Sequence, residues 1–213
     1  MIVHMLEYRV VPGHEAEVTG YLRHGALTET PSNGLAARFV GRRLSDKGRE
    51  HLAVTTWRDR AAFARGTDDE GLPAYLTSQS SLLRDRASSR YRLVASTGLD
   101  RVGGRVLRLY RSSVAAEAIE MWERRVLEQI GRLARREDVL TAVAGIETEA
   151  GGEGRGAGAA EVVVLTVWSE WDRLLAATGG HLDRSLMGTD LSDLERPATA
   201  DHFELLAPEL ITG

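Results

Sequence analysis

The stretch EHLAVTTW at residues 50–57 has a close counterpart, EVVVLTVW, at residues 161–168. Both stretches are rich in the β-branched and apolar residues of a buried strand, and both end in tryptophan. Polar residues that can begin a helix follow each of them. The two copies lie about half the chain apart, so Trp57 aligns with Trp168. A repeat at this spacing predicts two copies of one structural unit rather than one large domain.

Shorter matches flank this repeat on both sides. On the N-terminal side, LEYR at 6–9 aligns with RLYR at 108–111, which pairs Tyr8 with Tyr110. On the C-terminal side, YRLV at 91–94 aligns with FELL at 203–206. The spacing is shorter for the first of these matches than for the other two.

A Gly/Ala-rich stretch at 151–160 accounts for most of this difference in spacing. It has no apolar periodicity, and we expect it to form the tip of an extended hairpin. We therefore expect an N-terminal unit at 1–98 and a C-terminal unit at 103–213, the second with an insert at 150–160.

Each unit has the same order of periodic segments. In the C-terminal unit, apolar residues at steps of three and four predict a helix between Ile119 and Leu133. In the N-terminal unit we expect strands at 3–10, 35–43, 50–57 and about 90–95, turns at 12–13, 31–34 and 45–48, and helices from His14 and from Ala61.

This order, β-α-β-β-α-β, is typical of the ferredoxin-like α+β fold, an antiparallel four-stranded sheet with both helices on one face. The other face would expose apolar strand residues such as Val163, Leu165 and Val167. We expect the two sheets to pack face to face as an intrachain pseudo-dimer, a dimeric α+β barrel, which is also compatible with a homodimer.

Composition narrows the chemistry and the partners. The chain is 43% hydrophobic and 27% charged, has a net charge of −4 and contains no cysteine. Thiolate nucleophiles and cysteine-ligated metals are therefore excluded. The interspersed charges predict no nucleic-acid partner, and the lack of a long apolar run predicts no membrane partner. We expect a cytoplasmic protein with a small-molecule ligand.

Several motifs resemble the dimeric α+β barrel superfamily, and within it the antibiotic-biosynthesis-monooxygenase-like domains. They are RVVPG at 9–13, PSNG at 31–34, TTWRD at 55–59 and, in the second copy, TVWSE at 166–170. The resemblance covers nearly the whole chain and implies an oxidoreductase. Relatives include cofactor-free oxygenases of aromatic polyketides and haem-degrading enzymes. The Asn, Trp and His used in haem degradation are not kept, since Leu6 and Gly66 stand at the first two places.

The candidate ligand-contacting residues lie at the ends of the repeated strands. The resemblance implies that Trp57 and Trp168 line a cavity beside Thr55 and Thr166, while the structural alternative is that each indole only seals the core. Tyr110 is a further candidate for substrate binding.

The candidate catalytic residues are Tyr8, His51 and Arg108. A phenol can hydrogen-bond a substrate oxygen, an imidazole can act as a base, and an arginine favours a substrate anion. His4 and His51 lie on strands that we expect to be neighbours, so they are the histidines to consider first as a base. The dispersed histidines predict no metal site.

We therefore expect a monooxygenase-like enzyme without a cofactor that acts on a small planar aromatic or apolar substrate in a sheet–helix cavity. Two alternatives remain open. The absence of an evident acid–base set also fits a non-catalytic ligand-binding or assembly module. Haem binding needs only one suitably placed histidine.

Overall fold

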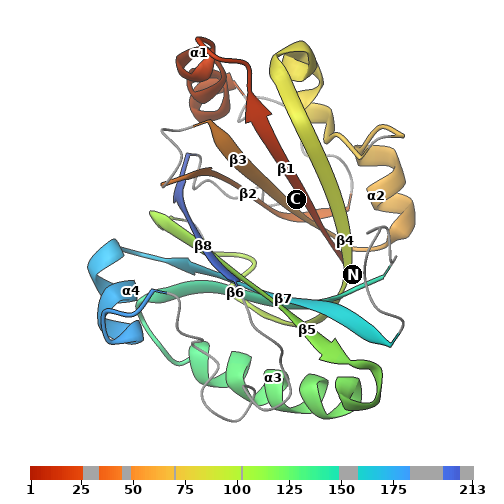
Figure 1. Cartoon of the computed structure of the whole chain (residues 1–213), viewed down its shortest axis with the longest axis vertical. Helices are drawn as coiled ribbons and strands as arrows, with labels where there is room; N and C mark the ends of the chain where they lie inside the picture. The colour runs from red at the N-terminus through yellow and green to blue at the C-terminus, as the bar shows by residue number, and fades with distance from the viewer. Residues whose placement is uncertain are drawn as a thin grey trace. The chain divides into compact units, whose positions relative to one another are not determined.

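Two βαββαβ repeats follow one another along the chain of this computed structural model (Figure 1). The structure describes residues 1–25, 34–44, 49–69, 71–101, 103–148, 158–182 and 199–206. The predicted turn at 45–48, most of the turn at 31–34 and most of the insert at 150–160 lie outside these residues.

The first repeat consists of β1 (Ile2–Val10), α1 (Glu15–Gly20) with a π-helical continuation (Tyr21–Gly25), β2 (Leu35–Arg43), β3 (Glu50–Trp57), α2 (Arg60–Gly66), a 3₁₀ helix (Ala74–Leu82) and β4 (Leu83–Thr97). The second consists of β5 (Val106–Ala115), a 3₁₀ turn (Ala116–Ala118), α3 (Ile119–Leu133), β6 (Val139–Glu147), β7 (Ala159–Trp168), α4 (Trp171–Thr178) and β8 (Thr199–Leu205). The predicted α+β class with two ferredoxin-like repeats is confirmed.

The chain folds into two compact units that divide it differently from the repeats. Unit 1 contains residues 1–90 and 202–213, and unit 2 contains residues 91–201. Strands β4 and β8 each pass from one unit into the other. The sheet of unit 1 has the order β1-β3-β2-β8, and that of unit 2 has the order β5-β7-β6-β4, with neighbouring strands antiparallel in both. The predicted face-to-face packing of the sheets stays a prediction.

Local sequence explains where one helix of unit 1 begins and where one helix of unit 2 ends. In unit 1, the carboxylate of Asp59 accepts a hydrogen bond of 2.7 Å from the N–H of Ala62 and so caps the start of α2. In unit 2, Gly179 has a φ of 63°, the left-handed conformation that ends α4.

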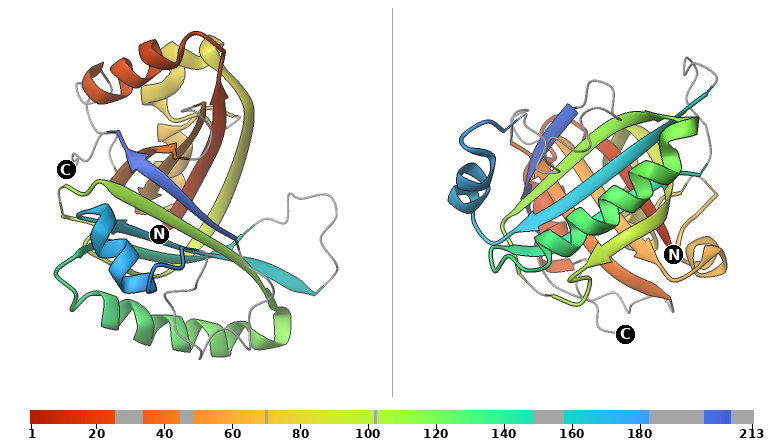
Figure 2. Two further views of the ribbon diagram at one scale, coloured as in Figure 1. Left: turned by 60° about the vertical axis from the view of Figure 1, so that its left-hand side comes forward. Right: turned by 90° about the horizontal axis from the view of Figure 1, so that it is seen from below.

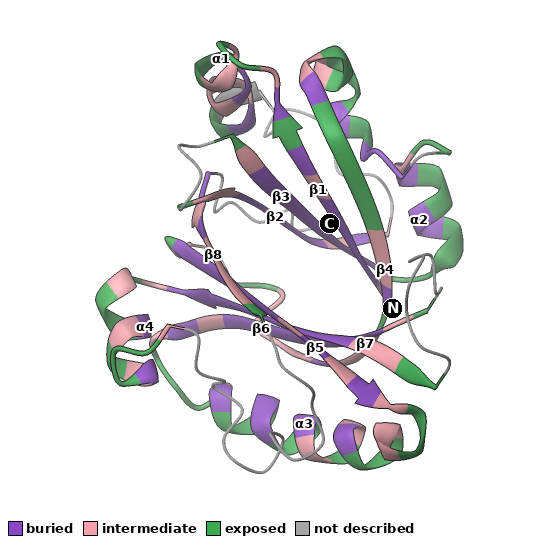
Figure 3. Cartoon of the chain, in the orientation of Figure 1, coloured by how far each residue is buried: buried purple, intermediate pink, exposed green. Residues whose placement is uncertain are grey.

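Helix α3 covers one face of the sheet of unit 2 (Figure 2). Trp122, Val126 and Ile130 form its buried stripe, while Met121 and Leu127 are exposed on the opposite side. Figure 3 shows the buried residues of α3 on its side towards the strands. The predicted helix is therefore confirmed, including its apolar stripe. No helix within the described ranges is long and apolar enough to span a membrane.

The strand register corrects the alignment of the first strands of the two repeats. Trp57 lies opposite Ile2 in unit 1, and Trp168 lies opposite Val106 in unit 2. Ile2 therefore corresponds to Val106, so the predicted match of Tyr8 with Tyr110 is wrong by two positions. A shift of two positions keeps every side chain on the same face of a strand, so the alternating pattern cannot detect it.

The corrected register changes the counterpart on β5 of each residue of β1. His4 corresponds to Arg108, Leu6 to Tyr110 and Tyr8 to Ser112.

The other two sequence matches agree with the register. Phe203 pairs with Arg43 beside Gly41, and Tyr91 pairs with Glu147 beside Gly145. A Cβ on Gly41 would lie 2.6 Å from the Cβ of Phe203, and one on Gly145 would lie 2.9 Å from the Cβ of Tyr91. In each unit, a glycine thus makes room for an aromatic residue of the neighbouring strand, β8 in unit 1 and β4 in unit 2.

Candidate active site in the first unit

The helix-facing side of the sheet in unit 1 carries two rows of polar residues that cross three strands. We call them the His4 row (His4, Thr55 and Arg38) and the Tyr8 row (Tyr8, His51 and Arg42), each in register across β1, β3 and β2. All of these residues except Arg42 are buried. An apolar row of Leu6, Ala53 and Val40 separates the two.

Unit 2 replaces three of these six polar residues by apolar ones. Ala142 stands at the position of Arg38, Val162 at that of His51, and Ile146 at that of Arg42. Among the described residues, Leu35, Trp57, Ala62 and Phe63 of unit 1 form an apolar cluster separate from the one that contains Leu6 and Val40, while α3 and the strands of unit 2 share one cluster. Buried polar groups destabilise a core unless they are hydrogen-bonded, and proteins often keep them where they take part in binding or catalysis. Unit 1 is therefore the better candidate for a functional site.

Tyr8 and His51 form a buried stacked pair. Their ring centroids are 5.3 Å apart and their planes are inclined by 10°. The Nδ1 atom of His51 lies 3.2 Å from the carbonyl oxygen of Arg49, which can only accept a hydrogen bond. Nδ1 therefore carries the proton and Nε2 presents a lone pair. Among the described residues, neither this Nε2 nor the hydroxyl of Tyr8 has a hydrogen-bond partner.

Burial sets the protonation states of the pair. Desolvation is the largest of several influences that bring the pKa of His51 down to about 4; the charge of Arg42 acts in the same direction, and the hydrogen bond to Arg49 opposes it. Desolvation likewise raises the pKa of the Tyr8 hydroxyl well above its ordinary value. At neutral pH, the pair therefore offers one neutral hydrogen-bond donor and one proton acceptor.

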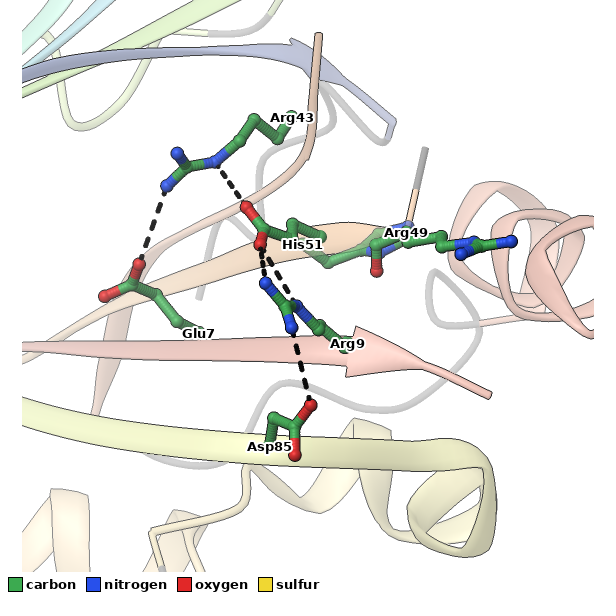
Figure 4. Close-up of polar contacts among 7 residues, drawn as sticks. Glu7, Arg9, Arg43, Arg49, His51 and Asp85 are labelled. Carbon is green, nitrogen blue, oxygen red and sulfur yellow. Dashed lines mark hydrogen bonds and ion pairs between the residues drawn. The ribbon is translucent and has the colours of Figure 1, made fainter. Parts of the chain in front are cut away.

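A cavity of about 360 Å³ adjoins this pair, and Tyr8 and His51 contribute to its wall. Apart from Ala87, the rest of the lining consists of charged residues that form a network of ion pairs (Figure 4). Arg9 lies 2.6 Å from Glu50 and 3.8 Å from Asp85, and Arg43 lies 2.9 Å from Glu50. The charges of Arg9 and Glu50 are on the face of β1 and β3 opposite to Tyr8 and His51, since side chains alternate along a strand.

The two histidines considered as a base are not neighbours. His4 and His51 are four residue pairs apart along the β1–β3 ladder, which is about 13 Å. His4 instead contacts Thr55 through Nδ1 at 3.3 Å and Ser88 through Nε2 at 2.9 Å. Burial, aided by the charge of Arg90, lowers its pKa to about 4. Both ring nitrogens are occupied, so this geometry gives His4 a structural role.

Each repeated tryptophan is hydrogen-bonded within its own strand. The indole N–H of Trp57 donates to the hydroxyl of Thr55 at 2.9 Å, and that of Trp168 donates to Thr166 at 2.8 Å. Both indoles are at most 2% exposed. This geometry supports the interpretation that the tryptophans seal the cores.

The remaining candidates, Arg108 and Tyr110, belong to unit 2 and not to the unit of Tyr8 and His51. The guanidinium of Arg108 lies 5.6 Å from the ring centroid of Tyr110 and donates to the carbonyl of Leu182 at 3.3 Å. The predicted catalytic residues are thus divided between the units.

Sequence reasoning missed Arg38, which is only 6% exposed. Its guanidinium lies 4.5 Å from the ring centroid of Tyr75, and no described carboxylate forms an ion pair with it. The available signal was a single charge inside the otherwise apolar stretch LAARFV at 35–40. No group of three or more potential metal-ligating side chains converges in the part of the chain that the structure describes.

No family model matches this sequence, and no curated protein does. Several solved structures are similar over nearly the whole chain. A monooxygenase candidate from Fusobacterium nucleatum has a TM-score of 0.69 at 11% identity, covering 98% of this chain and 93% of its own. An anthrone oxidase-like protein has a TM-score of 0.65 at 10% identity, covering 100% and 94%.

A ferredoxin-fold protein from Listeria monocytogenes, described as related to antibiotic biosynthesis monooxygenases, has a TM-score of 0.50 at 10% identity, covering 96% of this chain and 95% of its own. At these identities the likeness concerns the fold. The chain has the tandem ferredoxin-like α+β fold of antibiotic-biosynthesis-monooxygenase-like proteins.

Proposed function

We propose that unit 1 holds a monooxygenase-like active site that uses no cofactor and acts on a small planar aromatic substrate. The observation that carries this proposal is the Tyr8–His51 pair, which offers a buried hydroxyl donor and a buried imidazole acceptor, both without a partner among the described residues. The fold shared with an anthrone oxidase-like protein supports an anthrone as the first substrate to test.

In this proposal, Nε2 of His51 removes a proton from an acidic C–H group of an electron-rich phenol. The hydroxyl of Tyr8 donates a hydrogen bond to the substrate oxygen on which the negative charge develops. Burial excludes water from both groups, which strengthens their interaction with the substrate anion.

The substrate carbanion then reduces dioxygen, and a C–O bond forms to give a hydroperoxide once a proton is returned. Loss of water breaks the O–O bond and leaves a carbonyl group. For a methylene carbon, the balance is CH₂ plus O₂ giving C=O plus H₂O. Dioxygen is the only oxidant required, and the protein contributes binding, proton transfer and anion stabilisation.

Oxygen uptake with 1,8-dihydroxyanthrone in chelator-treated buffer tests the proposal. We expect the wild type to consume oxygen and to form the quinone. The variants His51→Val and Tyr8→Phe should each lower kcat by about 10²-fold or more, the usual range for lost acid–base groups. The control is His14→Gln, because His14 is an exposed histidine paired with Glu17. A wild type that consumes no oxygen above the buffer rate, or a His51→Val enzyme at full rate, would refute the proposal.

The non-catalytic alternative uses the same interior for binding alone, and binding of a planar phenol without oxygen uptake would favour it. The haem alternative is less well supported by the geometry. Both ring nitrogens of His4 are hydrogen-bonded, and the ring of His51 is packed against Tyr8. A Soret band on addition of haemin would favour haem binding.

A further inference from the structure

We propose that Arg38 is an anion-binding residue, and that the ligand of unit 1 is a planar molecule with an ionised carboxylate. This inference rests on the proposed site in unit 1 and adds the charge of its ligand. Arg38 belongs to the His4 row of the helix-facing interior and corresponds to no residue predicted from the sequence.

Arg38 is a buried cation that lacks a carboxylate partner among the described residues. Arginine keeps its charge in proteins, and burying an unpaired charge costs free energy. Its contact with the ring of Tyr75 offsets only part of this cost. Such a group is expected where a bound ligand supplies the opposite charge. Functional sites often contain groups that lower the stability of the fold because binding requires them.

The surroundings hold the guanidinium in a defined arrangement. The hydroxyl of Tyr21 donates to the backbone carbonyl of Tyr75 at 2.6 Å, which fixes the 3₁₀ helix that carries the Tyr75 ring. The guanidinium carbon lies 4.5 Å from the centroid of this ring. The planar fork of N–H donors of a guanidinium matches the two oxygens of a carboxylate.

Neighbouring arginines do not offer the same feature. Arg42, on the same face of β2, forms an ion pair with Glu204. In unit 2, the position of Arg38 is occupied by Ala142, and the buried Arg108 donates to the carbonyl of Leu182. Arg38 thus differs from Arg42 in having no described carboxylate partner, and its own position has no charged counterpart in unit 2.

A matched pair of probes tests the charge preference: anthraquinone-2-carboxylate and the neutral anthraquinone-2-carboxamide, with binding measured by calorimetry. We expect the wild type to bind the carboxylate at least tenfold more tightly. Arg38→Met should reduce this preference to about twofold or less, and Arg38→Lys should keep part of it. The control Arg65→Met removes an exposed charge of the same unit and should leave the preference unchanged.

A thermal melt shows whether Arg38→Met is folded. Because the variant loses an unpaired buried charge and keeps the apolar volume, we expect its Tm without ligand to rise by about 2–4 °C. A wild type that binds neither probe, or binds both equally, would overturn the inference, and so would an Arg38→Met protein that keeps the tenfold preference. Carboxylate binding without oxygen uptake would refute only the proposed reaction, and oxygen uptake without a charge preference would refute only this inference.

Discussion

Replacing His51 by valine, the residue at the corresponding position of unit 2, should make the protein less sensitive to acid. Burial lowers the pKa of His51 to about 4 in the folded protein, whereas an unfolded chain has the ordinary value of about 6.5. Unfolding therefore takes up a proton between these two pH values. The contribution of neutral His51 to stability is fully present above about pH 6.5 and is lost as the pH falls towards 4.

These values give the size of the effect. Between pH 7 and pH 5, His51 should lower the free energy of unfolding by about 2 kcal/mol, out of a limit of about 3 kcal/mol at lower pH. Urea unfolding at pH 7, 6 and 5 measures this free energy. His51→Val should be spared this loss, whereas the exposed-site control His14→Gln should follow the wild type. Parallel curves for the wild type and His51→Val would refute the reasoning.

Three further sets of substitutions test the packing. Gly41→Ala and Gly145→Ala should each lower the free energy of unfolding by about 1–3 kcal/mol, because the new methyl group meets an aromatic Cβ at 2.6 Å or 2.9 Å; unchanged urea midpoints would contradict this. Gly131→Ala, in α3 with no atom within 4 Å, should instead raise it by about 0.5–1 kcal/mol, and a loss would show that the site is not open. Trp57→Phe should cost about 1–3 kcal/mol because it removes the indole donor to the buried hydroxyl of Thr55 and leaves that hydroxyl only its contact with His4, and a fully retained Tm would argue against that role.

The fold was largely predictable because its signals are local and repeated. The strand ending at Trp57 and its counterpart ending at Trp168 are buried on both faces, so their composition is unusual and their alignment with each other is correct. Side chains of the first strands point alternately to the two faces of the sheet. A misalignment by two positions preserves that alternation. Tyr8 and Tyr110 were matched for this reason, although the register separates them.

The site was predictable only in part. Tyr8 and His51 were identified as separate candidates, but their stacking depends on the pairing of β1 with β3, which is a long-range property. Arg38 could not be found from its residue type, since most arginines are exposed and only the folded structure shows that this one is buried without a described carboxylate partner. The unit boundaries within β4 and β8 could not be predicted either, because they depend on long-range strand pairing rather than on local sequence.

The central claim is that a planar phenolic ligand binds in unit 1 against the unprotonated Nε2 of His51. Nitrogen-15 NMR of histidine-labelled protein tests this most directly, with 2,6-dihydroxyanthraquinone as the probe and His51→Val used to assign the signal. On saturation with the probe, the Nε2 signal of His51 should move upfield, as expected for an imine nitrogen that begins to accept a hydrogen bond, while the signals of the already bonded His4 should change little. A His51 signal that does not move when the probe is fully bound would contradict the claim.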